Sequence, residues 1–409
     1  MIVQPPVGTE PISRGALAFH QLTFLPEGDE VTVGRTETDS YCVLPADGAE
    51  LLQRLVRGMA PAQAAAWYAT EYGEPVDVEE FLEAMDELGF IRKSGVETST
   101  GPIRWQRFGA ALFARPAWAA YAFLVASAGL VMLRHHDLLP RTGNMYFCSY
   151  ATPVLLLAVF GQFPLVLLHE AFHALAGRRL GVNSRLRISR RLNILVAETA
   201  LDGLVVVPRR KRYLPILAGM LADLLVIAAL TLVAEACRRD GGGEPMAGRI
   251  CLALAYLTLL RFLWQFYFFL RTDLYQLIVT SLGCVDLHRT ASQLIANRVV
   301  RLLRWGRPRY DETSWHPRDR SAARWYSWVL VSGYAISLGT FVIAIVPLLF
   351  HLFRNVLRQF SQSRSVSLDS LADAWLFLLL TVAQLVAVGY LMLRERRQRH
   401  RAAVAHVIG

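Results

Sequence analysis

The sequence predicts a mainly α-helical, polytopic membrane protein with about six transmembrane helices and a small α+β, winged-helix-like domain at the N-terminus. Of the 409 residues, 54% are hydrophobic, and several apolar runs reach the roughly 20 residues that a helix needs to cross a bilayer. The formal net charge is +10, and an excess of Lys and Arg in such a chain is typical of cytoplasmic loops. The composition therefore argues against a soluble enzyme.

Residues 12–95 are expected to form the separate N-terminal domain. Short β-like runs fill residues 16–43, and a last short strand covers residues 90–92. Three stretches with helical periodicity lie between them: Asp47–Val56, Ala60–Tyr72 and Val78–Leu88. The later helices are rich in Asp and Glu, and an acidic surface repels phosphate. The domain is therefore expected to bind no nucleic acid.

Six membrane spans are predicted after a juxtamembrane linker at residues 96–115. They are Trp118–Leu133, Ala151–Ala176, Tyr213–Cys237, a long segment between Ile250 and Leu282, Trp325–Phe353 and Leu371–Leu393. The first four make up a membrane core at residues 116–283. A basic loop follows at 284–324, and the last two spans with a basic tail occupy 325–409.

The connecting loops predict the orientation of these spans. Loops at residues 177–191, 208–213 and 289–324 are rich in Arg, whereas the alternate loops are less consistently basic. The positive-inside rule then places the basic loops in the cytoplasm. An even number of spans puts both termini there, so the chain is expected to be a multi-pass protein of the cytoplasmic (inner) membrane.

Residues 169–173 read HEAFH and lie inside the second predicted span. Positions i and i+4 share one face of a helix, so His169 and His173 can reach one metal ion. Glu170 can then act on a metal-bound water. Ionisable side chains are costly in a bilayer, and their presence there indicates function. The alternative is a buried polar cluster that only joins helices.

A catalytic zinc site needs a third protein ligand, and two acids compete for this place. Asp273 lies in the long fourth segment. If that span ends near Ser281, Asp273 lies at the same depth in the membrane as His169. The span would then begin near Arg261, whose side chain would extend to the outer surface. Asp202 is followed by Gly203 between β-branched runs, a pattern typical of a hairpin turn. Asp273 is therefore the expected ligand.

Three further residues are candidates for substrate binding. Arg271 precedes Asp273 by two positions. It is expected to form an ion pair with Asp223, or else to polarise the scissile carbonyl or bind a substrate carboxylate. Residues 194–207 are expected to form a β-hairpin, which contains Glu198 and directly follows Asn193. The edge of this hairpin would hold an extended substrate strand. The alternative is a hairpin that only lies at the membrane interface.

Two features outside the core have simpler interpretations. The basic amphipathic stretch at residues 291–305 is expected to lie on the inner leaflet. Cys148 and Cys237 fall on the same predicted side of the membrane, which leaves a disulfide between them open. No cysteine pattern indicates a zinc ligand.

Residues 154–282 resemble the site-2 protease family of intramembrane zinc metalloproteases. His169, Glu170 and His173 match the zinc-binding helix of that family, and Asp202 stands in the L-D-G sequence found near its third ligand. Residues 218–223, AGMLAD, are similar to the family's A-G-P-x-x-N segment, and Asp273 fits its late Asp-Gly motif with Leu274 in place of Gly. These departures suit a divergent, peptide-processing branch.

The N-terminal domain resembles the PqqD-like fold, the leader-peptide recognition element of ribosomal peptide pathways. The resemblance rests on Tyr41–Pro45, on the helix from Gly48 to Leu55 and on VDVEEFLEAMDELGFI at residues 76–91. It implies that a peptide binds as an extra strand at an exposed sheet edge. A generic winged helix that only packs against the membrane domain is the alternative.

These expectations combine into one functional prediction. The chain is expected to be a zinc metalloendopeptidase that cuts a precursor or membrane-associated peptide recruited by its N-terminal domain, with His169, His173 and Asp273 as Zn²⁺ ligands and Glu170 as catalytic residue. The expected partners are that peptide and the lipid bilayer. The alternative is a non-catalytic membrane scaffold or export accessory whose histidines hold a structural metal, because a structural site does not need Glu170.

Overall fold

The structure, a computed structural model, describes most of the chain. Described are residues 18–28, 30–35, 40–92, 104–182, 184–191, 194–200, 202–238, 245–304, 306, 309–340, 342, 354, 369, 372–384, 386–387, 389–390 and 393–394. The chain divides into two compact units. The first consists of Met1–Arg104, Leu180–Ser184 and Leu201–Pro208, and the second holds the rest.

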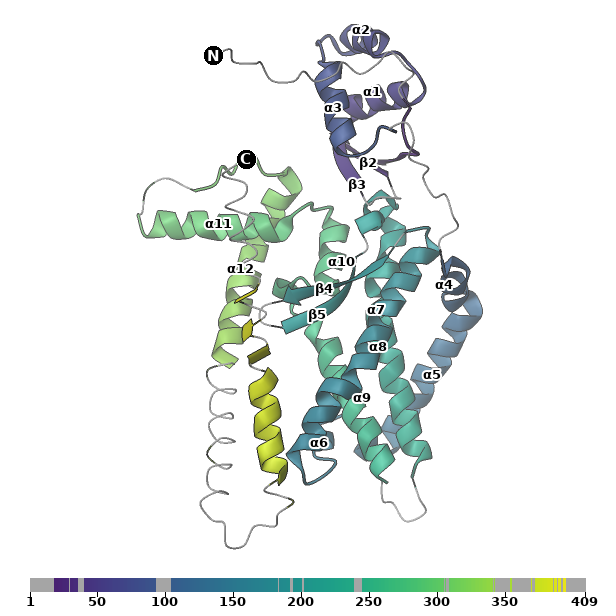
Figure 1. The fold of residues 1–409 in the computed structure, drawn as a ribbon, viewed down its shortest axis with the longest axis vertical. Helices are drawn as coiled ribbons and strands as arrows, with labels where there is room; N and C mark the ends of the chain where they lie inside the picture. The colour runs from purple at the N-terminus through teal and green to yellow at the C-terminus, as the bar shows by residue number, and fades with distance from the viewer. Residues whose placement is uncertain are drawn as a thin grey trace, which may run out of the picture. The chain divides into compact units, whose positions relative to one another are not determined.

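The first unit contains a three-stranded antiparallel sheet followed by three helices (Figure 1). The strands are β1 (Thr23–Glu27), β2 (Glu30–Arg35) and β3 (Ser40–Pro45), and the helices are α1 (Ala46–Val56), α2 (Pro61–Tyr72) and α3 (Val78–Glu87). A further antiparallel bridge joins Phe19 to Ile91. The predicted helices are therefore present in the expected order, whereas the predicted closing strand at residues 90–92 is reduced to this single bridge.

Local chemistry explains where these helices begin and end. Pro61 opens α2, where its missing N–H costs nothing, and Gly73 ends the helix with a positive φ of 76°. The Asp77 side chain accepts hydrogen bonds from the backbone N–H groups of Glu79 and Glu80 and so caps α3. Leu52, which is fully buried, joins α1 to the core of the sheet.

The second unit is built around four helices that are long and apolar enough to cross a membrane (Figure 1). They are α5 (Arg115–Arg134), the continuous Ala151–Arg179, α8 (Arg209–Ala236) and α9 (Met246–Trp264). The second of these consists of α6 (Ala151–Leu156), a π-helical turn (Leu157–Gly161) and α7 (Gln162–Arg179). Helix α8 is central, because it contacts α5, α7 and α9 and is the most buried of the four.

The last two predicted spans are only partly described. Helix α12 (Pro317–Thr340) covers the first half of Trp325–Phe353, and Ala372–Gln384 is a shorter apolar helix within Leu371–Leu393. The Asp373 carboxylate accepts hydrogen bonds from the backbone N–H groups of Ala151 and Thr152, which holds this helix at the start of α6. The total of six spans stays a prediction.

The predicted long fourth span is wrong, because the chain breaks in the middle of it. Helix α9 ends at Trp264, a short 3₁₀ turn η5 (Phe268–Leu270) follows, and α10 (Asp273–Leu282) begins anew. The side-chain oxygen of Gln265 accepts a hydrogen bond from the backbone N–H of Asp273. The backbone carbonyl oxygen of Gln265 accepts a hydrogen bond from the Thr272 hydroxyl. These bonds satisfy backbone that has left the helix, which is a requirement wherever such backbone is buried.

The predicted β-hairpin exists, but its position in the sequence was wrong. Strand β4 (Arg185–Arg191) pairs antiparallel with β5 (Ile194–Ala200), so the paired strands begin at residue 185 rather than at residue 194. Asp202 instead begins the 3₁₀ helix η4 (Asp202–Val206). The basic stretch at 185–191 alternates Arg with Leu, Ile or Ser over much of its length, and this period of two is typical of a strand.

The amphipathic stretch forms α11 (Leu287–Leu302), whose apolar residues divide between two environments. Leu294 is buried in a core shared with α10 and α12, whereas Val299, Leu302 and Leu303 are exposed. Contact with the inner leaflet stays a prediction for the exposed residues only.

All five cysteines are free, so the disulfide left open between Cys148 and Cys237 does not form. The Cys148 thiol donates a hydrogen bond to the carbonyl oxygen of Tyr150 instead.

Candidate metal centre

Helix α7 carries the three motif residues, and all three side chains are buried. His169 and His173 are one turn apart, so their imidazoles lie on the same face of the helix. Their Nε2 atoms approach to 3.1 Å. Glu170 follows His169 directly and is 8% exposed.

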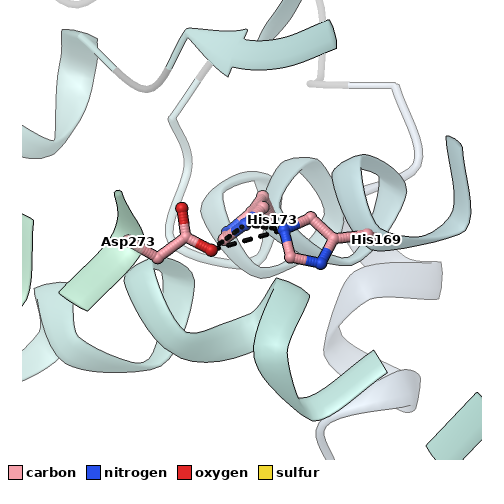
Figure 2. Close-up of side chains that lie close together, drawn as sticks. All are labelled: His169, His173 and Asp273. Carbon is pink, nitrogen blue, oxygen red and sulfur yellow. Dashed lines mark hydrogen bonds and ion pairs between the residues drawn. The ribbon is translucent and has the colours of Figure 1, made fainter. Parts of the chain in front are cut away.

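The third member of the group is Asp273, the first residue of α10. Its Oδ2 atom lies 3.3 Å from His169 Nε2 and 3.2 Å from His173 Nε2. Figure 2 shows the carboxylate of Asp273 directed at the two imidazoles. The three side chains are the only set of His, Cys, Asp and Glu among the described residues whose ligand atoms converge in this way. The structure thus brings together the three predicted ligands, although they come from helices 100 residues apart in the chain.

The dimensions of this group fit a tetrahedral zinc ion. Ligands about 2.0–2.1 Å from zinc at the corners of a tetrahedron lie about 3.3 Å from one another, and the three observed separations are 3.1, 3.2 and 3.3 Å. Asp273 Oδ2 is buried and has no hydrogen-bond donor among the described residues. Two imidazoles and one carboxylate leave a fourth corner for water, which is the ligand pattern of catalytic zinc sites.

The far side of each imidazole faces a group on α8. His173 Nδ1 lies 2.7 Å from the carbonyl oxygen of Pro215, so the ring donates there through Nδ1 and its Nε2 keeps a free lone pair. His169 Nδ1 lies 3.1 Å from Asp223 Oδ2, at an angle outside hydrogen-bond geometry. Ligating histidines in proteins are held in this way by carbonyl or carboxylate groups.

Gly219 makes the close approach of α7 and α8 possible. A Cβ atom at this position would overlap the Nε2 atoms of both His169 and His173. Because glycine has no side chain, α8 passes directly beside the converging nitrogen atoms. Pro215, Gly219 and Asp223 are spaced four residues apart and therefore line one face of α8.

Arg261 of α9 is the main partner of Asp223. Arg261 donates two hydrogen bonds to Asp223 Oδ1. One comes from Nε, at 3.1 Å, and the other comes from a terminal nitrogen of the guanidinium. The expected ion pair between Arg271 and Asp223 is therefore wrong. The expected contact of Arg261 with the outer membrane surface is also wrong, because its guanidinium is largely buried among α7, α8 and α9. A buried carboxylate competes better for a guanidinium than the surface does.

The weaker site predictions have mixed outcomes. Arg271 is exposed and adopts a left-handed backbone with φ of 56°, an unusual conformation for a residue with a side chain. Glu198 lies in β5 opposite Arg187, and Asn193 falls outside the described residues. Asp202 belongs to the first unit and is not part of the group formed by the histidines.

The choice between the two acids gives a direct prediction. Asp273→Asn should lower the zinc content of the purified protein, because the amide is a weaker ligand than the carboxylate. Asp202→Asn, made as the matched control, should leave it unchanged. Zinc measured by mass spectrometry in both variants decides the assignment, and the reverse result would transfer the third ligand to Asp202.

The sequence analysis placed Gly219 and Asp223 in the AGMLAD segment, but it did not predict the contact of Pro215 with His173 or the pairing of Asp223 with Arg261. The spacing of the three α8 residues is a usable signal, since it places them on one face. An Arg within an apolar helix is another, because it requires a buried acceptor. Neither signal identifies which helix supplies the partner.

Comparison with known proteins adds no family to these findings. No protein-family model matches the chain, and neither a curated protein nor a solved structure does.

Proposed function

We propose that the protein is an intramembrane zinc metallopeptidase that hydrolyses a peptide bond in a precursor or membrane-associated peptide. One observation carries this proposal: the ligand atoms of His169, His173 and Asp273 form a buried triangle with the edge lengths of a zinc tetrahedron. The sequence supplies Glu170 next to the first ligand, where hydrolysis requires a base.

The roles of the residues follow from their chemistry. Zinc, when bound, supplies a Lewis acid and lowers the pKa of a water molecule toward about 7. His169, His173 and Asp273 would hold the ion. Glu170 would take a proton from the attacking water and return it to the departing amine. A purely structural metal would not need a carboxylate next to its first ligand.

The elements beside the site suggest how a peptide is presented. Strand β5 contacts α7, and both strands of the two-stranded β4–β5 sheet are edge strands. A substrate carbonyl is accessible only where the substrate is not helical, and an extended peptide can pair with such an edge. The N-terminal domain, with its edge strands β1 and β3, would recruit the peptide from the cytoplasm.

The test uses the full-length protein purified in detergent. We expect about one zinc ion per chain, and cleavage of unstructured, fluorescence-quenched peptides that stops when the zinc is removed by a chelator and returns when zinc is added. His169→Ala and His173→Ala should lose both the metal and the activity. A folded wild-type protein that binds no zinc would contradict the proposal.

A further inference from the structure

We propose that Asp223 and Arg261 form a buried positioning pair, in which Arg261 fixes Asp223 and Asp223 fixes the imidazole of His169 for metal binding. This inference rests on the proposed zinc site but adds residues that are not ligands. It assigns a purpose to the buried ion pair that joins α8 to α9.

Asp223 is fully buried and divides its two oxygen atoms between two partners. Oδ1 accepts from Arg261, while Oδ2 lies 3.1 Å from His169 Nδ1. Among the described residues Oδ2 accepts no hydrogen bond, and the ring nitrogen of His169 is the polar group that it faces. A carboxylate that only balanced Arg261 would direct both oxygens at the guanidinium, because the two-pronged geometry is the stronger one. The observed division links the arginine to the metal ligand.

Arg261 is held on its remaining sides, so it provides a fixed support. One terminal nitrogen donates to Gln162 Oε1 at 3.1 Å, and the other reaches the carbonyl oxygen of Leu165 at 3.3 Å. Gln162 donates in turn to the carbonyl oxygen of Leu254. The guanidinium thus connects α7, α8 and α9 immediately before the turn of α7 that carries His169.

The pair has a definite consequence for His169. A carboxylate beside Nδ1 favours the tautomer with its proton on Nδ1, which leaves the Nε2 lone pair directed at the metal position. The negative charge also makes the imidazole a stronger donor to a cation. His173 obtains the same orientation from the neutral Pro215 carbonyl. The carboxylate therefore acts on one of the two histidines only.

The expected effect is a loss of zinc affinity without a loss of ligands. Removal of comparable partners of metal-bound histidines costs about 10–100-fold in affinity. Removing only one member of a buried ion pair leaves an unpaired charge and destabilises the fold. The informative variant is therefore the double change Asp223→Asn with Arg261→Gln, which keeps polar side chains at both positions and removes both charges.

The experiment measures zinc affinity by chelator competition on full-length, detergent-purified protein, with circular dichroism and gel filtration to establish folding. The double variant should bind zinc about 10–100-fold more weakly than the wild type. Arg261→Lys keeps the positive charge but cannot donate two hydrogen bonds to Asp223. Its zinc affinity should therefore lie between that of the wild type and that of the double variant. Asp319→Asn, which removes another buried carboxylate that caps residues 285–286, is the matched control and should bind normally.

A second readout separates positioning from general stability. Cobalt(II) replaces zinc and absorbs visible light in a way that depends on ligand geometry, so the double variant should show a shifted cobalt spectrum and the Asp319→Asn control should not. Wild-type affinity and spectrum in both the double variant and Arg261→Lys would overturn the inference and leave the zinc site intact. A wild-type protein without zinc affinity would overturn the proposed function as well.

Discussion

Glu170→Gln should keep about one zinc ion per chain and lose peptide cleavage. The amide resembles the carboxylate in size and remains polar, so the buried environment of the side chain is preserved, and Glu170 is not one of the three converging ligands. It cannot take a proton from water, however, and general acid–base catalysis contributes about 10²–10⁴-fold to a rate. Zinc content and cleavage of quenched peptides, measured on the same preparation, check this result.

The comparison of metal content with activity makes this variant decisive. His169→Ala serves as the reference, since it should lose the metal together with the activity. If Glu170→Gln cleaved peptides at the wild-type rate, the residue would have no catalytic role, and a structural metal in a membrane scaffold would become the better explanation.

Gly219→Ala should abolish zinc binding although it changes a residue that is not a ligand. The added methyl group would occupy the space beside the Nε2 atoms of His169 and His173, so the imidazoles would have to move apart or α7 would have to separate from α8. Either movement destroys a geometry in which the ligand atoms lie 3.1–3.3 Å apart. Zinc content and the cobalt spectrum of the variant test this prediction.

Gly129→Ala provides the matched control for this substitution. Gly129 also lies in an apolar helix, α5, and a Cβ atom there would meet nothing within 4 Å. Replacing an interior helical glycine by alanine is otherwise stabilising by about 0.5–1 kcal/mol. The control should therefore bind zinc normally. Normal zinc binding by Gly219→Ala would show that the metal does not lie between the two histidines.

The sequence predicted local elements well and their interruptions poorly. The three helices of the N-terminal domain and the first three long apolar helices follow from periodicity and length, which are local properties. The break between Trp264 and Asp273 was missed because the apolar run continues through it. The non-helical backbone there is held by a hydrogen bond that the Gln265 side chain accepts and by one that the Thr272 hydroxyl donates, and hydrophobic periodicity does not reveal such bonds.

In the candidate site, too, local features could be predicted from the sequence and contacts between helices could not. The spacing of His169 and His173 brings them together on any helix, so the sequence alone predicts this half of the site. Asp273 was chosen from an assumed depth in a continuous helix that does not exist, so its closeness to the histidines was predicted for the wrong reason. The pairing of Asp223 with Arg261 rather than Arg271 depends on helix packing, which one sequence does not reveal.

X-ray absorption at the zinc edge of the purified full-length protein tests the central claim most directly. The account predicts about one zinc ion per chain with only nitrogen and oxygen neighbours at about 2.0–2.2 Å, including the outer-shell scattering of two imidazoles. It also predicts that Asp273→Asn weakens this signal. Absence of zinc from a folded preparation, or sulfur neighbours at about 2.3 Å, would contradict a site made of His169, His173 and Asp273.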